Sequence, residues 1–140
     1  MKASRALAQF DARSIASSGL GVSDFAVLEI LLHKGPLPVN TIGRSVMLTS
    51  GSISAAIDRL ERKQFLARQA CPKDGRVTYV ALTAAGRRLI RRVFKAHAGQ
   101  LETVFKPLST DERAALATLL KKLGKRAESL LQPGNQESRS

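Results

Sequence analysis

The sequence is poor in cysteine, in aromatic residues and in long apolar runs. The single cysteine among 140 residues, Cys71, excludes a disulfide within the chain and favours a reducing, cytoplasmic location. Tryptophan is absent and aromatic residues make up 4% of the chain, so we expect aliphatic side chains on helices to form the core. Residues 1–20 lack the continuous apolar segment of a secretory signal, and the longest apolar run, 26–32, is interrupted by Glu29. A membrane helix needs roughly 20 apolar residues, so no membrane partner is expected.

Acidic residues are also scarce, and this determines the expected partner. Only 11 Asp and Glu oppose 23 Lys and Arg, which gives a formal net charge of +12. Most of the excess lies in residues 86–132, which hold eleven bases and four acids. Such a charge in general favours a polyanion, either nucleic acid or an anionic membrane surface, and with no membrane partner expected, nucleic acid is the predicted partner.

The sequence contains no motif that predicts catalysis or a bound cofactor. There is no Gly-rich phosphate loop, no HExxH and no GxSxG, so an enzyme is not predicted. His33, His97 and Cys71 do not have the spacing of metal ligands, and zinc takes about four of them. His97 lies within an apolar stripe, where we expect a residue at an interface or pocket edge with a satisfied hydrogen bond.

Three helices are predicted in the first third of the chain. A helix over Ala3–Ser17 precedes one that Ser23 caps and that Lys34-Gly35-Pro36 ends. Pro38 then opens a short helix, Val39–Val46, with apolar residues at i, i+3 and i+7. Helices joined by such short connections pack as neighbours.

A fourth helix follows closely and is apolar along one narrow stripe. Met47-Leu48 form a brief turn, and Thr49 or Ser50 caps the helix, which runs to about Lys63. Its other positions are small, polar or charged. The apolar stripe consists of Ile53, Ala56, Ile57 and Leu60.

A basic β-hairpin comes next. β-Branched residues and the only tyrosine predict strands over Phe65–Ala70 and Val77–Leu82. Between them, residues 71–76 contain Pro and Asp-Gly, which are turn residues, together with Lys73 and Arg76. A purely structural hairpin does not require a charged tip of this kind.

Two long helices complete the chain. Thr83 caps a helix to about Lys106, and the Ser109–Glu112 capping box starts another that extends to Leu131. Both are apolar along one face, and a monomer of this size cannot cover these faces together with that of the first helix. Pairing of two copies would bury them.

The order of elements predicts a mainly α fold with a small β-hairpin wing, that is, a winged helix-turn-helix. A helix about 10–12 Å wide fits the major groove of DNA, and its N-terminal N–H groups suit a phosphate. The hairpin tip is suited to an adjacent minor groove, where Arg is favoured. The candidate DNA-binding residues are Thr49, Ser50, Gly51, Ser52, Ser54, Arg59 and Arg62 of the helix, and Lys73, Asp74 and Arg76 of the hairpin.

Several segments together resemble the MarR (multiple antibiotic resistance regulator) family. The resemblance covers roughly residues 20–125. Its motifs are weak singly and distinctive jointly. They are Gly51-Ser-Ile-Ser-Ala-Ala-Ile-Asp-Arg-Leu-Glu, Phe65-Leu-Ala-Arg68, Asp74-Gly-Arg76 and Leu82-Thr-Ala-Ala-Gly-Arg87, with Gly35-Pro-Leu37 and Leu108-Ser-Thr-Asp-Glu-Arg113.

The resemblance implies a homodimeric transcriptional regulator. It implies a helical dimerisation region from residues 1–19 and 84–131, a winged helix-turn-helix over 20–83, and a pseudo-palindromic double-stranded DNA operator, usually under repression. A small-molecule effector, in many members an anionic phenolic compound, is implied between the dimer lobe and the reading head. Residues 132–140 have the composition of a flexible tail.

The family pattern also assigns a role within the wing. Asp74 is implied to pair with Arg76 and to aim it, while Gly75 replaces a frequently basic residue. Pro38 stands where members often have a capping Ser or Thr, so the following helix lacks a side-chain cap.

Three alternatives stay open at this level. The first is a basic winged-helix module that binds RNA, the second is such a module that docks on protein, and the third is a redox-sensing regulator that uses Cys71. The bases after the wing either flank the DNA backbone or form a solvated helix face. They are Arg87, Arg88, Arg91, Arg92 and Lys95.

Overall fold

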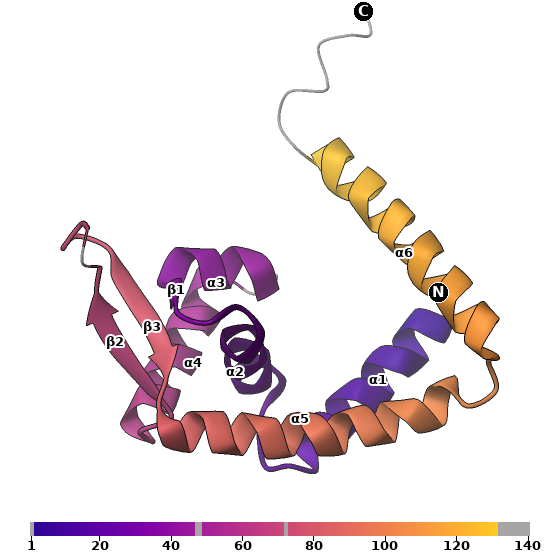
Figure 1. The fold of residues 1–140 in the computed structure, drawn as a ribbon, viewed down its shortest axis with the longest axis horizontal. Coiled ribbons are helices and arrows are strands. Elements are labelled where there is room, and N and C mark those ends of the chain that lie inside the picture. The colour runs from indigo at the N-terminus through magenta and orange to yellow at the C-terminus, as the bar shows by residue number, and fades with distance from the viewer. Residues whose placement is uncertain (1, 47–48, 72, 132–140) are drawn as a thin grey trace, which may run out of the picture. The chain divides into compact units, whose positions relative to one another are not determined.

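The computed structural model describes residues 2–46, 49–71 and 73–131, and it confirms a mainly helical winged helix-turn-helix (Figure 1). The chain divides into two compact units, residues 1–101 and 102 onward. The predicted turn at residues 47–48 and the tail 132–140 lie outside the described residues. The elements are α1 (Lys2–Ala16), α2 (Val22–Lys34), β1 (Leu37–Pro38), α3 (Val39–Val46), α4 (Ser50–Arg62), β2 (Leu66–Ala70), β3 (Thr78–Leu82), α5 (Ala84–Phe105) and α6 (Thr110–Leu131).

The core of the first unit forms where α2, α3, α4, β3 and α5 meet. The predicted stripe of α4 is fully buried there, since Ile53 is 1% exposed and Ala56, Ile57 and Leu60 are 0% exposed. Aliphatic side chains supply most of this core, as the composition predicted. The largest fully buried ones are Leu28, Leu31, Ile42, Ile53, Ile57, Leu60, Ile90, Val27 and Val80.

The sheet has three antiparallel strands in the order β1-β3-β2, where the sequence predicted two. In β1, Leu37 pairs with Val80 and Pro38 with Tyr79, so β1 extends the hairpin at its base. A two-residue strand is too short to show the alternation of apolar and polar residues that predicts a strand. Pro38 cannot donate a hydrogen bond to the sheet, and it is tolerated because β1 is an edge strand.

Capping residues set the starts of α4 and α5 as predicted. The Thr49 hydroxyl accepts a hydrogen bond from the Ser52 N–H (3.2 Å), and the Thr83 hydroxyl accepts one from the Gly86 N–H (3.0 Å). The prediction for α2 was wrong. This helix begins at Val22 after an extended Gly21 that provides no side-chain cap, which places Ser23 inside the first turn.

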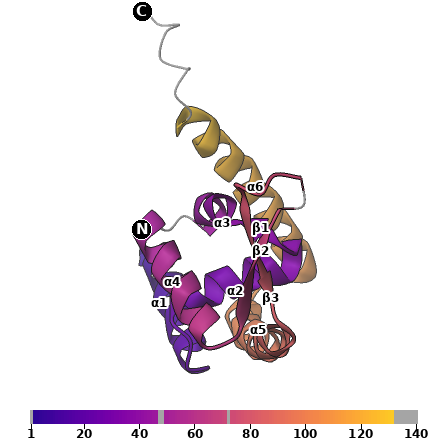
Figure 2. The same ribbon diagram turned by 90° about the vertical axis from the view of Figure 1, so that its left-hand side faces the viewer.

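The foot of the wing is joined tightly to the start of α5. The Thr83 N–H donates to the Phe65 carbonyl (3.0 Å), and the Thr83 hydroxyl donates to the Gln64 carbonyl (2.7 Å). A Cβ placed on Gly86 would lie 2.0 Å from the Phe65 carbonyl oxygen, so only glycine fits here without movement of the backbone. Figure 2 shows α5 nearly end-on at the foot of the hairpin.

A buried polar cluster joins α1 to α5. The imidazole of His97 on α5 lies 2.8 Å from the Ser14 hydroxyl through Nδ1 and 3.0 Å from an Asp11 carboxylate oxygen through Nε2. The ring of Phe25 on α2 packs edge-on against the same imidazole, with ring centroids 5.1 Å apart. His97 is therefore buried with a satisfied hydrogen bond, as predicted, while its place at an interface or pocket edge stays a prediction.

In the second unit, polar contacts hold the connection between the end of α5 and the start of α6. The predicted capping box is present, since the Ser109 N–H donates to Glu112 (2.8 Å) and the Glu112 N–H donates to Ser109 (3.2 Å). Arg113 donates to the Phe105 carbonyl (2.8 Å) and pairs with the Glu102 carboxylate. No residue of α6 is buried. Its exposed leucines are Leu119, Leu120, Leu123, Leu130 and Leu131, from 58% to 79% exposed.

Candidate nucleic-acid interface

The exposed start of α4 has the chemistry expected of a DNA-reading helix. Thr49 caps it, and the Thr49 hydroxyl also donates to the Ser52 hydroxyl (2.9 Å), while Gly51 has open space around it. Ser52 and Ser54 are exposed. The side chain of Ser50 lies outside the described residues. The helix therefore buries one stripe and presents small polar groups, with unpaired N–H groups at its N-terminus, on the other face.

A groove brings the start of α4 and the wing together. It encloses about 880 Å³ between α3, α4 and the beginning of β3, and both Ser54 and Arg76 line it. Val39, Ile53 and Val77 contribute apolar surface to its wall. Two residues that the sequence predicted separately, on a helix and at a hairpin tip, thus meet in one concavity.

The groove also contains polar residues that sequence reasoning missed. They are Asn40 and Arg44 from α3 and Thr78 from β3. The sequence interpretation assigned α3 only as the first helix of the motif and did not consider its polar face. The available signal was the polar side of the short helix, where Asn40 and Arg44 alternate with the apolar positions.

The wing tip is exposed and ordered by Asp74. An Asp74 carboxylate oxygen accepts a hydrogen bond from the backbone N–H of Arg76 (3.0 Å), and the Asp74 carbonyl accepts one from the Val77 N–H (3.1 Å). The implied pairing of Asp74 with Arg76 thus goes to the backbone N–H and not to the guanidinium. An Asp side chain in a turn reaches the N–H two residues ahead, which explains this geometry. Lys73 and Arg76 are both exposed.

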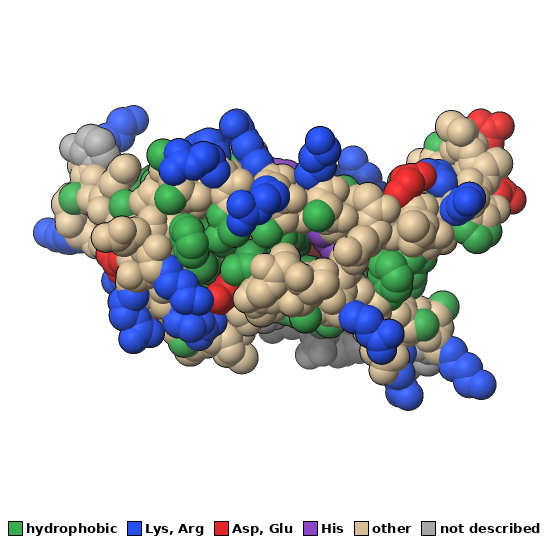
Figure 3. All heavy atoms as spheres, turned by 90° about the horizontal axis from the view of Figure 1, so that it is seen from below, with side chains coloured by type: hydrophobic (Ala, Val, Ile, Leu, Met, Phe, Trp, Pro, Cys, Tyr) green, Lys and Arg blue, Asp and Glu red, His purple; other side chains and the backbone are tan. Residues whose placement is uncertain are grey.

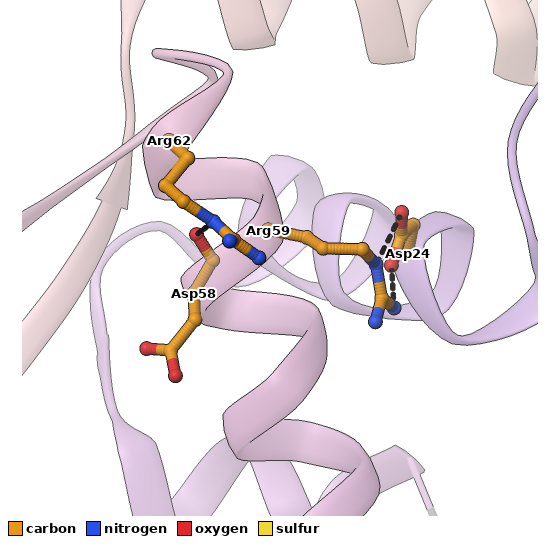
Figure 4. A network of polar contacts seen from close by, with 4 residues as sticks. All are labelled: Asp24, Asp58, Arg59 and Arg62. Carbon is orange, nitrogen blue, oxygen red and sulfur yellow. Dashed lines mark hydrogen bonds and ion pairs between the residues drawn. The ribbon is translucent and has the colours of Figure 1, made fainter.

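Arg59 forms an ion pair that the sequence did not predict, and its contact with DNA stays a prediction. Its guanidinium bonds the Asp24 carboxylate at 2.5 Å and 3.4 Å, and Figure 4 shows it extended from α4 toward α2. The Asp24 side chain is 8% exposed and that of Arg59 42%. The hydrogen bond and charge of Asp24 raise the pKa of the Arg59 guanidinium above its ordinary value. Arg59 therefore holds α4 against α2, and its guanidinium is engaged within the protein.

A second set of ion pairs joins α4 to the wing. Arg68 on β2 contacts the carboxylates of Asp58 (2.6 Å) and Glu61 (3.1 Å) on α4. The sequence analysis did not identify this contact, although Asp58 and Glu61 are spaced to lie on one helix face. The helix α4 and the wing are thereby connected to each other as well as to the core.

Arg62 is the arginine of α4 that stays exposed. Its Nε–H donates only to the backbone carbonyl of Asp58 (3.4 Å), one turn earlier in the same helix (Figure 4). Arg62 is the last residue of α4, whereas Arg44 and Arg76 line the groove at the start of this helix and Lys73 lies on the wing tip. Positive side chains beside an exposed helix start are the arrangement expected for phosphate contacts.

These features define a winged helix-turn-helix DNA-binding head. The family model described as "MarR family" matches residues 20–78. The regulator MhqR of Bacillus subtilis is 39% identical over 116 residues, which cover 83% of this chain and 80% of that protein. The chain therefore belongs to the MarR family of HTH-type transcriptional regulators. Among the described residues, none of the helices has both the length and the apolar character needed to cross a membrane.

Further relatives and solved structures agree with this assignment. The uncharacterised regulator YkoM of Bacillus subtilis is 36% identical over 130 residues, which make up 93% of this chain and 84% of that protein. The crystal structure of a probable transcriptional regulator from Pseudomonas aeruginosa has a TM-score of 0.72 at 31% identity, covering 85% of this chain and 92% of that one. The PcaV regulator of Streptomyces coelicolor, solved with its natural ligand, has a TM-score of 0.74 at 28% identity, covering 89% and 90%.

Proposed function

We propose that this protein is a cytoplasmic homodimeric repressor that binds a pseudo-palindromic operator and is released by a small anionic ligand. The groove lined by both Ser54 and Arg76 is the observation that carries the DNA-binding part of this proposal. The proposed contacts come from the start of α4 and from the wing. They are Thr49, Ser50, Gly51, Ser52, Ser54 and Arg62, with Lys73 and Arg76, while Asp74 orders the tip and Arg59 positions α4.

Each element has a distinct role in this proposal. The start of α4 enters the major groove, where hydroxyl groups bond base edges or phosphates and Arg62 contacts the backbone. Arg76 at the wing tip enters the neighbouring minor groove, which attracts Arg where it is narrow. Arg44 on α3 lies in the same groove of the protein and adds a contact to phosphate.

The apolar faces of the terminal helices support a homodimer. Leu119, Leu120 and Leu123 on α6 are 58–67% exposed in the single chain, and Leu7 on α1 is 47% exposed. We assign residues 1–19 and 84–131 to dimerisation through their apolar faces, because a second copy would cover these leucines and leave the basic outer side of α5 exposed. Two-fold symmetry then places two reading heads about 34–36 Å apart, one turn of DNA.

A small-molecule effector completes the proposal. The PcaV relative was solved in complex with its natural ligand, and the family resemblance favours an anionic phenolic compound. Such a ligand releases DNA if it binds more tightly to a form of the dimer whose two heads no longer match the operator.

The test is selection of bound duplexes from random sequence, followed by footprinting and light scattering. We expect a two-fold symmetric site with half-sites one turn apart and a particle of twice the 15.1 kDa chain mass. Addition of salicylate or 4-hydroxybenzoate then shortens the lifetime of the complex. Enrichment of no sequence, or a monomeric particle on DNA, would refute the proposal.

A further inference from the structure

The outer face of α5 carries a concentrated positive charge that the reading head does not use. We call it the α5 arginine face, and its members are Arg87, Arg88, Arg91, Arg92 and Lys95, all exposed. Residues 84–101 contain no acidic side chain, since Glu102 is the first in α5. None of the five forms an ion pair with a residue in the described ranges 2–46, 49–71 and 73–131.

The face is set by the helix and points away from the core. The buried side of α5 holds Gly86, Ile90, Val93 and His97, which recur every three or four residues. At 3.6 residues per turn, the basic positions fall nearly opposite this set. From the first to the last of them the helix rises about 12 Å, so five charges occupy just over two turns.

These charges repel one another. Arg87 and Arg91, Arg88 and Arg92, and Arg91 and Lys95 are i,i+4 pairs of like sign, an arrangement that destabilises a helix. A solvated helix face ordinarily mixes both signs, which gives attractive pairs at the same spacings. A bound polyanion would remove the repulsion and convert this cost into binding affinity.

The α5 arginine face is separate from the DNA-reading surface within the first unit. The wing tip with Arg76 precedes β3, whereas α5 follows it, so the length of the strand separates them, about 20 Å for six or seven extended residues. Figure 1 shows α5 at the end of the hairpin away from its tip. Viewed from the α5 side, Lys and Arg side chains follow the helix (Figure 3).

We propose that the α5 arginine face binds the phosphate backbone of a second DNA duplex, so that the protein bridges two DNA segments. This inference rests on the proposed function, since the first segment is the operator held by α4 and the wing. Four of the five residues are Arg, whose planar fork suits phosphate. The face contains no large exposed hydrophobic side chain, whereas a helix that lies on a lipid surface needs them.

The test captures one DNA by another. A selected operator duplex is fixed on beads and saturated with the full-length protein, excess protein is washed away, and a fluorescent random-sequence duplex is added at 100 mM salt. We expect retention of the second duplex at least fivefold above beads without protein, and loss of this excess at 400 mM salt, since contacts to several phosphates are strongly salt-dependent.

Two triple variants locate the second site. R88Q/R91Q/R92Q removes three charges from α5, and K121Q/K122Q/K125Q removes the same number from α6 as a matched control. Both are expected to bind the operator within twofold of wild type, and circular dichroism confirms that they are folded. Only the α5 variant is expected to lose capture of the second duplex.

The outcomes separate this inference from the proposed function. If wild type fails to bind the operator, the proposed function fails. If wild type binds the operator but captures no second duplex, or if the α5 variant captures as well as wild type, the bridging inference is overturned. An α5 variant that loses affinity only for operators with long flanks would place the face on the same duplex, and flotation with phosphatidylserine vesicles that equals DNA capture would place it on lipid. Either result also overturns bridging.

Discussion

Replacing Arg59 with Met tests whether the contact between α4 and α2 holds the reading helix in place. The substitution keeps most of the side-chain volume and leaves the Asp24 carboxylate, 8% exposed, without its cation. A hydrogen bond to a charged group contributes about 1.5–3 kcal/mol, whereas an exposed ion pair contributes about 0.2–1 kcal/mol. Asp24 is buried but Arg59 is 42% exposed, so solvent screens part of the interaction. We expect the free energy of unfolding to fall by about 2 kcal/mol.

The assay is urea unfolding followed by circular dichroism at one fixed protein concentration, because stability of a dimer depends on concentration. Arg62→Met is the matched control. It lies three residues further along α4 and contacts only a backbone carbonyl, so we expect a change within about 0.5 kcal/mol. The double variant Asp24→Asn/Arg59→Met should lose less than the sum of the single variants. Equal losses for the Arg59 and Arg62 variants, or strict additivity with Asp24→Asn, would refute the positioning role.

The raised pKa of Arg59 determines how the stability difference between wild type and the Arg59→Met variant depends on pH. A cation whose pKa is higher in the folded state contributes its full stabilisation of the fold at pH values below its unfolded-state pKa. This contribution is lost only as the pH rises through the folded-state pKa. Both lie far above neutrality for arginine. Arg59 itself therefore adds no change between pH 6 and 9, and a stability difference that vanishes on raising the pH within this range would contradict the assignment.

Three further substitutions address the wing foot, the wing tip and the dimer. Gly86→Ala should lower the free energy of unfolding by about 2 kcal/mol or more in thermal or urea melts, because the new Cβ would clash with the Phe65 carbonyl. The control is Gly99→Ala, which lies in open space on the same helix and should be neutral or stabilising. Equal effects at the two glycines would argue against close packing. Arg76→Ala should weaken operator binding by at least about 1 kcal/mol at fixed salt with an unchanged melting temperature, and an unaltered affinity in titrations would exclude a groove contact. Leu123→Glu should shift light scattering toward the 15.1 kDa chain, and a fully dimeric variant would place the interface elsewhere.

Much of the fold could be predicted from the sequence because its determinants are local. The stripe of α4 and its Thr49 cap lie within one helix, and the capping box of Ser109 and Glu112 lies within four residues. Such signals depend on helical period and hydrogen bonds between near neighbours. They predicted the order of the six helices and of the hairpin, and the bounds of α3.

The parts that sequence reasoning missed depend on contacts between distant residues. Asp24 and Arg59 are 35 positions apart, and their pairing follows only once α2 and α4 are packed together. The predicted role of Arg59 in DNA contact was based on its charge alone, which gives no information about a buried carboxylate elsewhere. In the same way, β1 exists because β3 offers it a pairing edge, and no local pattern in two residues reports that.

Within α4, the residues that hold the helix in the fold differ from those proposed to contact DNA. The residues that hold the helix in place are its buried stripe, Arg59, and the two acids that pair with Arg68. By contrast, Gly51 has open space around it and Ser54 is exposed. Under the proposed function, substitution of the exposed positions would change the preferred target sequence with little loss of stability. Operator preference and folding would then depend on separate sets of positions along a single helix.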